Sequence, residues 1–287
     1  MRTTEQSSNY DNLDKMTTNE ILTAINTEDR RVPDAVALAI PQIEKLVEAI
    51  VERMPRGGRV FYIGAGTSGR LGIVDASEIP PTYGVKDKFI GLIAGGDTAI
   101  RSAVEGAEDD WDQGWRELEA FIPSKDDVII GIAASGVTPY VIGAVRKARE
   151  LGILTACITS NDGSPLEAAV DIPVVSVTGP EFVTGSTRMK SGTALKLILN
   201  MISTAVMIRL GHVRGSRMVD MELTNSKLVD RGTRMIMAET GITDYEYARN
   251  LLLTHGHGDH IGGVEQTLED FPGAKVVAHE AEAEMRG

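Results

Sequence analysis

The amino-acid sequence predicts an α/β protein in which a parallel sheet lies between layers of helices. From residue 59 onward, short apolar segments alternate with segments of helical period, which is the pattern of a parallel sheet covered on both faces. Two of the apolar segments, at 59–63 and 127–132, lead directly into turns rich in glycine and hydroxyl side chains. After residue 187 the helical period dominates, so we expect a small helical portion after the sheet.

The first 55 residues are expected to form an N-terminal helical arm. Residues 1 to about 15 are polar. Thr17 followed by Glu20 fits a capping box, which predicts a short helix through residue 26. A longer helix is predicted next, because apolar residues recur at helical spacing over Val36–Met54.

The alternation then predicts the elements of the sheet and its helices. We expect strands near 59–63, 89–93, 127–132, 153–158 and 172–177. We expect helices near 68–78, 98–120, 138–151, 188–210, 226–240 and 244–253. The corresponding division is an arm over 1–55, a sheet domain over 56–215, a helical portion over 216–254 and a tail over 255–287.

The composition fits a soluble globular protein. The chain has 287 residues, 42% of them hydrophobic and 24% charged, which suffices for a real core. The formal net charge of -12 argues against a nucleic-acid partner, because phosphate backbones need clustered Lys and Arg. The single cysteine, Cys157, lies in an apolar run, so we expect it to pack in the core of a protein from a reducing compartment.

The sequence also predicts a cytoplasmic protein with no membrane partner. The N-terminus lacks the apolar stretch of a signal peptide. The most apolar helical stretch, Leu197 to Ile208, is too short to cross a bilayer.

The two glycine-rich turns predict that the protein binds a phosphate group. A strand that ends in small residues and opens a helix leaves backbone N–H groups and a positive dipole end aimed at an anion. One such turn is a weak signal, since tight geometry also requires glycine, but two favour a phosphomonoester on a small sugar. The candidate residues are Gly66, Thr67 and Ser68 in the first turn and Ser135, Gly136 and Thr138 in the second.

Nucleotide binding is the alternative for these turns. The spacing of Gly64, Gly66 and Gly69 resembles the start of a dinucleotide-binding motif, but no acidic residue closes the second strand at 89–93. No Gly-Lys-Ser/Thr sequence ends either turn, so the phosphate-binding loop of NTPases is absent.

Acidic residues near these turns are candidates for acid–base chemistry. Glu78 lies before two prolines that restrict the backbone, so we expect it near a chain reversal. On the helix predicted at 98–120, one apolar stripe is formed by Ile100, Val104, Ala107 and Trp111. Glu108 lies closer to this stripe than Glu105, which makes it the better candidate for a desolvated acid or base. A solvated position on the helix surface is the alternative for each.

A third segment, residues 179–193, places charges and hydroxyls around a predicted helix start. Ser186 is suited to cap that helix, and Glu181 precedes it. Arg188 and Lys190 offer positive charge to an anionic ligand.

Together these segments resemble the N-acetylmuramic acid 6-phosphate etherases, over residues from about 5 to about 254. The segments that carry the resemblance are Gly64–Gly72, Asp75–Glu78, Ile93–Gly96, Glu105–Asp109, Ala133–Gly136 and Thr184–Lys190. The resemblance implies the sugar isomerase (SIS) fold, an αβα sandwich, and a homodimer with sites near the subunit interface. It also implies a bacterial cytoplasmic role in recycling a cell-wall amino sugar.

The reaction that this resemblance implies is cleavage of the lactyl ether at C3, giving N-acetylglucosamine 6-phosphate and D-lactate. In the ring-opened sugar the C1 aldehyde acidifies the C2 proton, so a base and an acid suffice for elimination, and water then adds without a metal or organic cofactor. By resemblance Glu78 protonates the departing lactate oxygen, and Glu108 is the second catalytic glutamate, to which we assign the C2 proton. The substrate-binding residues are then those of the two turns together with Glu181, Ser186, Arg188 and Lys190.

The C-terminal tail departs from this family. His255, His257, Asp259 and His260 resemble the metal motif of the metallo-β-lactamase superfamily. That superfamily builds its metal centre on a two-sheet sandwich with further ligands downstream, and this chain ends at Gly287. We therefore expect a grafted tail without a hydrolase centre, with adventitious zinc binding as the alternative.

Three other functions remain open on the sequence alone. A non-catalytic sugar-phosphate sensor would keep the phosphate turns and bind a partner enzyme, and an aldose–ketose isomerase would also remove a proton beside a carbonyl. A metal-dependent hydrolase would use the tail. The pair of Glu78 and Glu108 favours catalysis over sensing, and only an etherase would release lactate.

Overall fold

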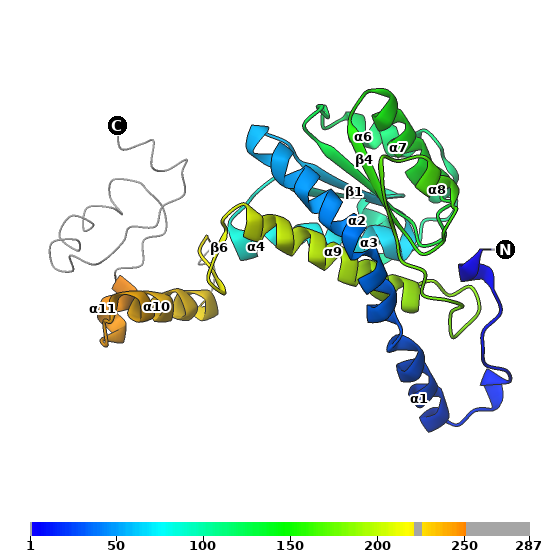
Figure 1. The fold of residues 1–287 in the computed structure, drawn as a ribbon, viewed down its shortest axis with the longest axis horizontal. Helices are drawn as coiled ribbons and strands as arrows, with labels where there is room; N and C mark the ends of the chain where they lie inside the picture. The colour runs from blue at the N-terminus through cyan, green and yellow to red at the C-terminus, as the bar shows by residue number, and fades with distance from the viewer. Residues whose placement is uncertain (1, 221–225, 251–287) are drawn as a thin grey trace. The chain divides into compact units, whose positions relative to one another are not determined.

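The computed structural model describes residues 2–220 and 226–250, which divide into two compact units (Figure 1). The first unit contains the sheet and spans the described residues up to 79 and residues 86–210. The described part of the second unit consists of residues 80–85, 211–220 and 226–250. All of the predicted substrate-binding and catalytic residues lie in the first unit.

The N-terminal segment is helical and belongs to the first unit. Its α-helices and 3-10 helices (η) are η1 Thr3–Glu5, η2 Leu13–Lys15, α1 Thr18–Asp29, α2 Val32–Arg53 and η3 Met54–Arg56. The predicted capping box is confirmed, because the Thr17 side chain accepts the backbone N–H of Glu20 and the Glu20 carboxylate accepts that of Thr17. Gly57, with a φ of 97°, ends the helical segment before the sheet.

Five parallel strands form the sheet in the order β2-β1-β3-β4-β5. They are β1 Val60–Gly64, β2 Phe89–Ile93, β3 Val128–Ile132, β4 Leu154–Thr159 and β5 Ile172–Val175. β1 and β3 are buried along their whole length, as parallel strands covered by helices on both faces must be. The five predicted strands are confirmed, with small shifts at their ends.

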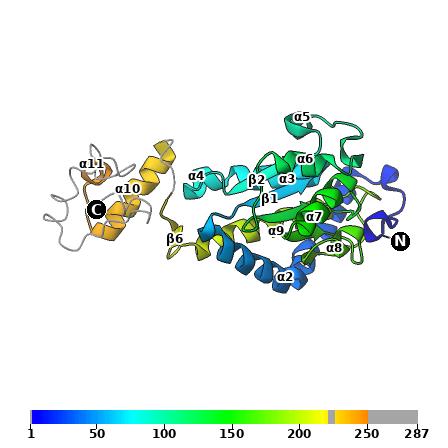
Figure 2. The ribbon, with the colours of Figure 1, turned by 90° about the horizontal axis from the view of Figure 1, so that it is seen from above.

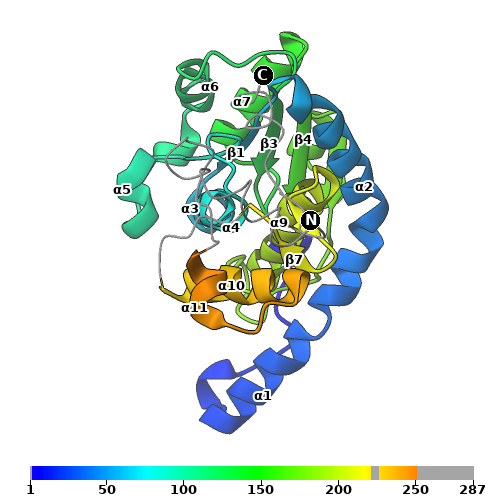
Figure 3. The ribbon, with the colours of Figure 1, turned by 90° about the vertical axis from the view of Figure 1, so that its left-hand side faces the viewer.

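Two helical layers cover the sheet (Figures 2 and 3). α2 packs beside α9 (Lys190–Arg209), and α3 (Gly66–Ser77) packs against β1, β2 and α9, so these helices cover one face. α6 (Gln113–Glu119), α7 (Pro139–Glu150) and α8 (Pro165–Ala168) cover the other face. There, Tyr140, Val141 and Val145 are fully buried in one cluster with Ile129 of β3. The expected αβα sandwich is confirmed.

The second unit contains short elements. α4 (Ile79–Tyr83) leads into it, and its other elements are β6 Val213–Arg214, β7 Arg217–Met218, α10 Ser226–Thr240 and α11 Tyr245–Asn250. β6 and β7 pair in antiparallel fashion. The helix predicted at 226–240 is confirmed, and that predicted at 244–253 is confirmed up to the last described residue.

The single helix predicted over 98–120 is wrong. The chain forms α5 (Gly96–Arg101), η4 (Ala107–Asp109) and α6 instead. Ser102 is extended, with φ -134° and ψ 139°, and Gly106 has a φ of 72°, and neither conformation continues an α-helix.

The predicted apolar stripe on that helix is therefore also wrong. Val104 and Trp111, which were expected to face the core, are 40% and 48% exposed. Glu108 consequently borders no buried helix face, and Glu105 and Glu108 are both exposed. The helical geometry no longer distinguishes these two carboxylates.

The structure tests two predictions about apolar segments, the one around Cys157 and the one at Leu197–Ile208. Cys157 is buried in β4, which confirms core packing, and burial raises the pKa of its thiol to about 12. The apolar stretch Leu197–Ile208, predicted to be too short to cross a bilayer, lies within the longer helix Lys190–Arg209, which has 20 residues and a mean hydropathy of 1.4 and is long and apolar enough to cross one. No other helix in the described residues passes this test. Ile198, Ile202 and Val206 of this helix are fully buried where it packs against α2 and α3, as in the core helix of a globular domain.

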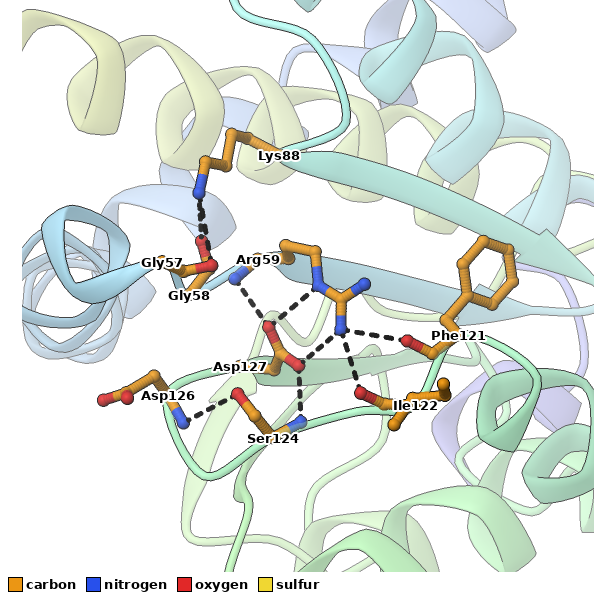
Figure 4. A network of polar contacts seen from close by, with 9 residues as sticks. All are labelled: Gly57, Gly58, Arg59, Lys88, Phe121, Ile122, Ser124, Asp126 and Asp127. Atoms are coloured by element: carbon orange, nitrogen blue, oxygen red, sulfur yellow. Dashed lines mark hydrogen bonds and ion pairs between the residues drawn. The ribbon is translucent and has the colours of Figure 1, made fainter. Parts of the chain in front are cut away.

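A polar network joins the segments that precede β1 and β3, at the N-terminal end of the sheet (Figure 4). The Arg59 side chain donates to the two carboxylate oxygens of Asp127 at 3.1 and 2.9 Å, and Asp127 also accepts the backbone N–H groups of Arg59 and Ser124. Arg59 donates further to the carbonyls of Phe121 and Ile122. Burial acts to raise the pKa of Asp127, but the hydrogen bonds from Arg59 and the backbone N–H groups outweigh it and lower that pKa.

Candidate functional site

The two glycine-rich turns leave the sheet side by side, where the strand order reverses. β2 adjoins β1 on one side and β3 adjoins it on the other, so the connections that follow β1 and β3 diverge from this point. Gly64, at the end of β1, pairs in register with Ile132, at the end of β3. Ligands of open α/β sheets bind outside the carboxyl ends of the strands at such a switch point. The structure therefore brings the two turns together at the expected place for a ligand.

The glycines of the first turn have separate structural reasons. Gly66 has a φ of 52°, in the left-handed region that favours glycine. A Cβ on Gly69 would lie 2.6 Å from the Ile93 side chain and 2.9 Å from the Gly64 backbone, so only glycine lets α3 approach β1 this closely. The chain can then open α3 directly after the strand, with Thr67 and Ser68 in the first helical turn.

The second turn is built in a similar way after β3. Gly136 has a φ of 68°, and a Cβ there would lie 2.4 Å from the Ser164 side chain. The Ser135 hydroxyl accepts the backbone N–H of Val137 at 3.4 Å. Thr138 occupies the N-cap position of α7, and Pro139 follows as the first helical residue.

The helices that follow the two turns have no side-chain cap at their N-terminus, as is also true of α2, α5 and α6, whereas α1 and α8 are capped. α1 has the Thr17 capping box, and the Ser164 hydroxyl accepts an N–H group of α8. The N-cap residues of α3 and α7 make no side-chain cap hydrogen bond. Since the first N–H groups of a helix have no intrahelical partners, these two helices offer donors and a positive dipole end to an anion.

Hydroxyl side chains lie beside these free donors. Among the residues that the structure describes, the hydroxyls of Thr67, Ser68 and Thr138 make no hydrogen bond to another protein group. Ser68 is 7% exposed, and the other two are half-buried. The arrangement can supply several neutral hydrogen-bond donors to one phosphate group.

The segment at 179–193 is arranged differently from the prediction. Glu181 is fully buried, and its carboxylate accepts the backbone N–H groups of Lys190 and Ser191 at 2.8 and 2.9 Å. Glu181 therefore caps α9, and the prediction that Ser186 is the cap is wrong. A charged carboxylate binds two helical N–H groups more strongly than a serine hydroxyl does. Ser186 lies half-buried in the loop before the helix.

The cations of this segment lie in contrasting environments. The Lys190 side chain is 1% exposed, and its ammonium pairs with Glu28 of α1 at 2.5 Å. Arg188 is exposed, and within the described residues its guanidinium pairs with no carboxylate. Glu181 and Lys190 therefore bond groups inside the protein and stabilise the fold. Arg188, in contrast, remains available to a ligand.

The two predicted catalytic glutamates lie on different elements. Glu78 follows α3, so it lies roughly 18 Å along the helix axis from the turn at Gly66. It is exposed, and it lies between the end of α3 and the start of α4. Glu108 lies in η4, which packs beside α7, the helix that follows the second turn. Within one chain, Glu78 is therefore remote from the first turn.

The sequence analysis missed the contacts between the N-terminal segment and this edge of the sheet. Figure 1 shows the segment beside the loop that connects β5 to α9. Thr4 is buried and pairs with Asn161, and Ser8 donates to the Phe182 carbonyl at 2.7 Å. One sequence feature indicates such a contact: Asn161 is a polar residue shortly after the apolar strand β4, at the edge of the sheet where the turns lie.

Family comparisons agree with the arrangement of the sheet and the turns. The model of the glucokinase regulatory protein N-terminal SIS domain matches residues 42–149, and that of the SIS domain matches residues 122–205. Residues 249–287 match the metallo-beta-lactamase superfamily, which confirms the resemblance of the tail. The residues of its metal motif, His255, His257, Asp259 and His260, lie outside the described residues.

Solved structures with the same fold include two phosphoheptose isomerases. The enzyme from Francisella tularensis has a TM-score of 0.52 at 19% identity, and the one from Neisseria gonorrhoeae has a TM-score of 0.50 at 20% identity. The matches cover 67% and 66% of this chain and 98% of each isomerase chain. At this level of identity they establish the SIS fold alone.

Relatives in sequence are much closer. The N-acetylmuramic acid 6-phosphate etherase of Bacteroides thetaiotaomicron is 62% identical over 257 residues, which are 89% of this chain and 92% of the relative. The etherase of Porphyromonas gingivalis is 63% identical over 88% of this chain and 92% of its own length, and that of Yersinia pestis is 53% identical over 82% and 80%. With this identity over nearly its whole length, the chain belongs to the N-acetylmuramic acid 6-phosphate etherase family of carbon–oxygen lyases.

Proposed function

We propose that this protein cleaves the D-lactyl ether of N-acetylmuramic acid 6-phosphate to give N-acetylglucosamine 6-phosphate and D-lactate. The observation that carries the proposal is the pair of uncapped, hydroxyl-bearing turns at the switch point, in a chain that belongs to this etherase family. A sugar phosphate is the ligand that such a site fits, because its phosphate group accepts hydrogen bonds from helix N-termini and hydroxyls.

The 6-phosphate binds between the two turns in this proposal. The first turn contributes Gly66, Thr67 and Ser68, and the second contributes Ser135, Gly136 and Thr138. Arg188 supplies a cation, and Ser186 lies on the same loop. Glu181 and Lys190, which have partners inside the protein, hold that loop in place through the α9 cap and the ion pair with Glu28.

The reaction proceeds by elimination and then addition of water. The C1 aldehyde of the ring-opened sugar acidifies the C2 proton, and the Glu108 carboxylate accepts this proton as the C2–C3 double bond forms. The C3–O bond breaks, and the carboxyl group of Glu78 donates a proton to the departing lactate oxygen. Water then adds its hydroxyl to C3 and a proton to C2. The balance is hydrolysis of the ether, and the chain's carboxyl groups carry each proton.

We infer that the active form is a homodimer whose sites combine residues from two copies. Glu78 lies roughly 18 Å from the first turn of its own chain, along a straight helix, and it is exposed. Glu78 of a second copy can approach the turns across a two-fold axis, since such an interface brings the same surface of each copy together. The location that fits this catabolic role is the bacterial cytoplasm, where the muropeptide sugar is recycled.

The test is incubation of the purified chain with N-acetylmuramic acid 6-phosphate and measurement of D-lactate. Release of lactate together with N-acetylglucosamine 6-phosphate supports the etherase. Binding of the sugar phosphate without lactate release would favour the sensor, an alternative supported by the match to the SIS domain of a regulatory protein. Interconversion of an aldose and a ketose phosphate would favour an isomerase.

A further inference from the structure

The buried side-chain amide of Asn161 bonds the carbonyl side of the turn after β3. Asn161 is 2% exposed, and its side-chain nitrogen donates to the carbonyls of Ala134 at 3.0 Å and Ser135 at 3.2 Å. The Ala134 carbonyl also accepts the backbone N–H of Ser160 and the hydroxyl of Thr159. The carbonyl side of this turn is therefore bound firmly to the end of β4.

This anchoring decides where the opposite side of the turn points. In a trans peptide the carbonyl of Ala134 and the N–H of Ser135 point in opposite directions, and the described residues contain no cis peptide. With its carbonyl held toward Asn161, the peptide directs the Ser135 N–H away from Asn161. This N–H makes no backbone hydrogen bond in the described residues. It is available to the ligand.

The N-terminal segment fixes the amide of Asn161 in turn. The Thr4 backbone N–H donates to Asn161 Oδ1 at 3.2 Å, and Asn161 Nδ2 lies 2.9 Å from the Thr4 hydroxyl, so its two hydrogens are shared among this oxygen and the carbonyls of Ala134 and Ser135. Because the Ala134 and Ser135 carbonyls can only accept, this pairing allows one orientation of the amide. Thr4 is 1% exposed, so the contact excludes water.

The same segment also contacts the loop before α9. The Ser8 backbone N–H donates to the Thr184 hydroxyl at 2.9 Å, and the rings of Tyr10 and Phe182 pack with centroids 5.0 Å apart. One continuous stretch of chain thus connects the second turn with the loop that carries Arg188.

We propose that Asn161 is a positioning residue for the phosphate site, and that Thr4 of the N-terminal segment holds its side chain in place. Asn161 directs the Ser135 N–H at the 6-phosphate and does not contact the substrate itself. The proposal rests on the proposed function for the identity of the substrate, but its central statement concerns phosphate binding. Inorganic phosphate alone therefore tests it.

The experiment measures inorganic phosphate binding by calorimetry, and KM and kcat with the sugar phosphate, for three variants. Asn161→Asp removes the two donors and faces the turn carbonyls with an acceptor. Thr4→Val keeps the backbone N–H and the shape but removes the hydroxyl. Thr155→Val is the matched control, because Thr155 is fully buried in β4, the strand that precedes Asn161, and bonds Asp171, away from the turn.

Asn161→Asp should weaken phosphate binding and raise KM by roughly tenfold or more, as expected for loss of one hydrogen bond to a charged group, with a smaller change in kcat. Thr4→Val should show the same pattern to a lesser degree, and Thr155→Val should lower the melting temperature without affecting phosphate binding. The proposal is overturned if Asn161→Asp folds and binds phosphate like the wild type, or if Thr155→Val weakens binding equally. Absence of lactate release by the wild type would refute the etherase, while the phosphate titrations would still decide the role of Asn161.

Discussion

The two ends of the parallel sheet use their polar groups in opposite ways. At the N-terminal end, the Asp127 carboxylate accepts hydrogen bonds from the Arg59 side chain, the Arg59 backbone and the Ser124 backbone, so its acceptors are occupied inside the protein (Figure 4). At the carboxyl end, α3 and α7 start without side-chain caps, and the hydroxyls of Thr67 and Thr138 have no protein partner in the described residues. Polar groups that are satisfied within the fold stabilise it, whereas groups left unsatisfied at the surface remain available to a ligand.

We therefore expect substitutions at the two ends of the sheet to affect different properties. A change at the N-terminal end of the sheet should lower the free energy of unfolding and leave the catalytic rate unaffected at a temperature where the variant is folded. A change at the carboxyl end should lower activity and leave stability nearly constant.

Replacement of Glu78 with Gln is expected to have the largest effect. Loss of the general acid should lower kcat for lactate release by roughly 10²–10⁴-fold, while phosphate binding and the melting temperature stay close to the wild-type values. Glu105→Gln is the control, since Glu105 is also an exposed glutamate and has no assigned role. Wild-type turnover in Glu78→Gln would contradict the acid assignment.

Mixing two inactive variants tests whether the site combines two copies of the chain. In a mixed dimer of Glu78→Gln and Glu108→Gln, one of the two sites receives both native glutamates if Glu78 comes from the partner. Random pairing should then restore about a quarter of the wild-type activity, since half of the dimers are mixed and each has one intact site. No recovery after mixing, with subunit exchange verified by mass spectrometry, would place both glutamates in one chain.

Asp127→Asn should have the largest effect on stability. Asp127 is 1% exposed, so the change leaves Arg59 without its charged partner and should cost about 3 kcal/mol of unfolding free energy in urea titrations. Asp126→Asn, next to it in Figure 4, is the control, because the Arg56–Asp126 pair is partly exposed and worth less than about 1 kcal/mol. A strong loss of kcat in folded Asp127→Asn would break the separation between the two ends.

The pH dependence of the unfolding free energy tests whether the ionised Asp127 carboxylate stabilises the fold. Because the pKa of Asp127 is lowered in the folded state, its stabilisation is fully present above the unfolded value of about 3.9 and is lost as the pH falls through the folded pKa. The wild type should therefore lose more stability than Asp127→Asn does when urea titrations are compared between pH 6 and pH 3. Parallel losses would show that the carboxylate is not the group that titrates.

The sequence predicted the parts of the fold that local patterns encode. Apolar runs placed the five strands, and the glycine turns indicated the binding edge because Gly66 and Gly136 adopt positive φ where strand turns into helix. The failure at 98–120 has a local cause as well. Four apolar residues at helical spacing favoured one helix, but Ser102 and Gly106 break it. Periodicity alone does not register such a break, since a helix tolerates an isolated glycine.

Contacts between distant parts of the chain were beyond local patterns. The ion pair of Lys190 with Glu28 spans 162 positions, and the pairing of Asn161 with Thr4 spans 157. Each residue type on its own predicts exposure, because Lys, Glu and Asn are mostly found at the surface. Only the fold brings their partners to them, so these roles for Lys190 and Asn161 required the structure.

Thr67→Val sharpens the comparison at the carboxyl end by removing one hydroxyl with little change in shape. The variant should raise KM for the sugar phosphate by roughly tenfold, because it loses one hydrogen bond to a charged group, and should leave the melting temperature unchanged. Thr155→Val provides the opposite pattern, since the Thr155 hydroxyl donates to Asp171 at 2.8 Å near the N-terminal end of β4. Equal losses of stability in the two variants would contradict the distinction.

Asp75→Asn should have the smallest effect, and it tests the comparison on a second inward-facing carboxylate. Asp75 accepts hydroxyl hydrogen bonds from Tyr62 and Ser203, each at 3.1 Å, whereas Asp127 is paired with an arginine. Burial raises the pKa of Asp75, and the two hydroxyl bonds only partly oppose this.

The sign of the pH effect is therefore opposite for the two carboxylates. A carboxyl group with a raised folded pKa contributes stability below its unfolded pKa, and that contribution is lost as the pH rises through the folded pKa. At pH 7 the ionised Asp75 carries a desolvation cost that Asn does not, so Asp75→Asn should be as stable as the wild type or slightly more stable at this pH. At pH 4 the wild type should regain the advantage. A large destabilisation of Asp75→Asn at pH 7, comparable to that of Asp127→Asn, would mean that hydroxyl donors stabilise a buried carboxylate as well as a guanidinium does.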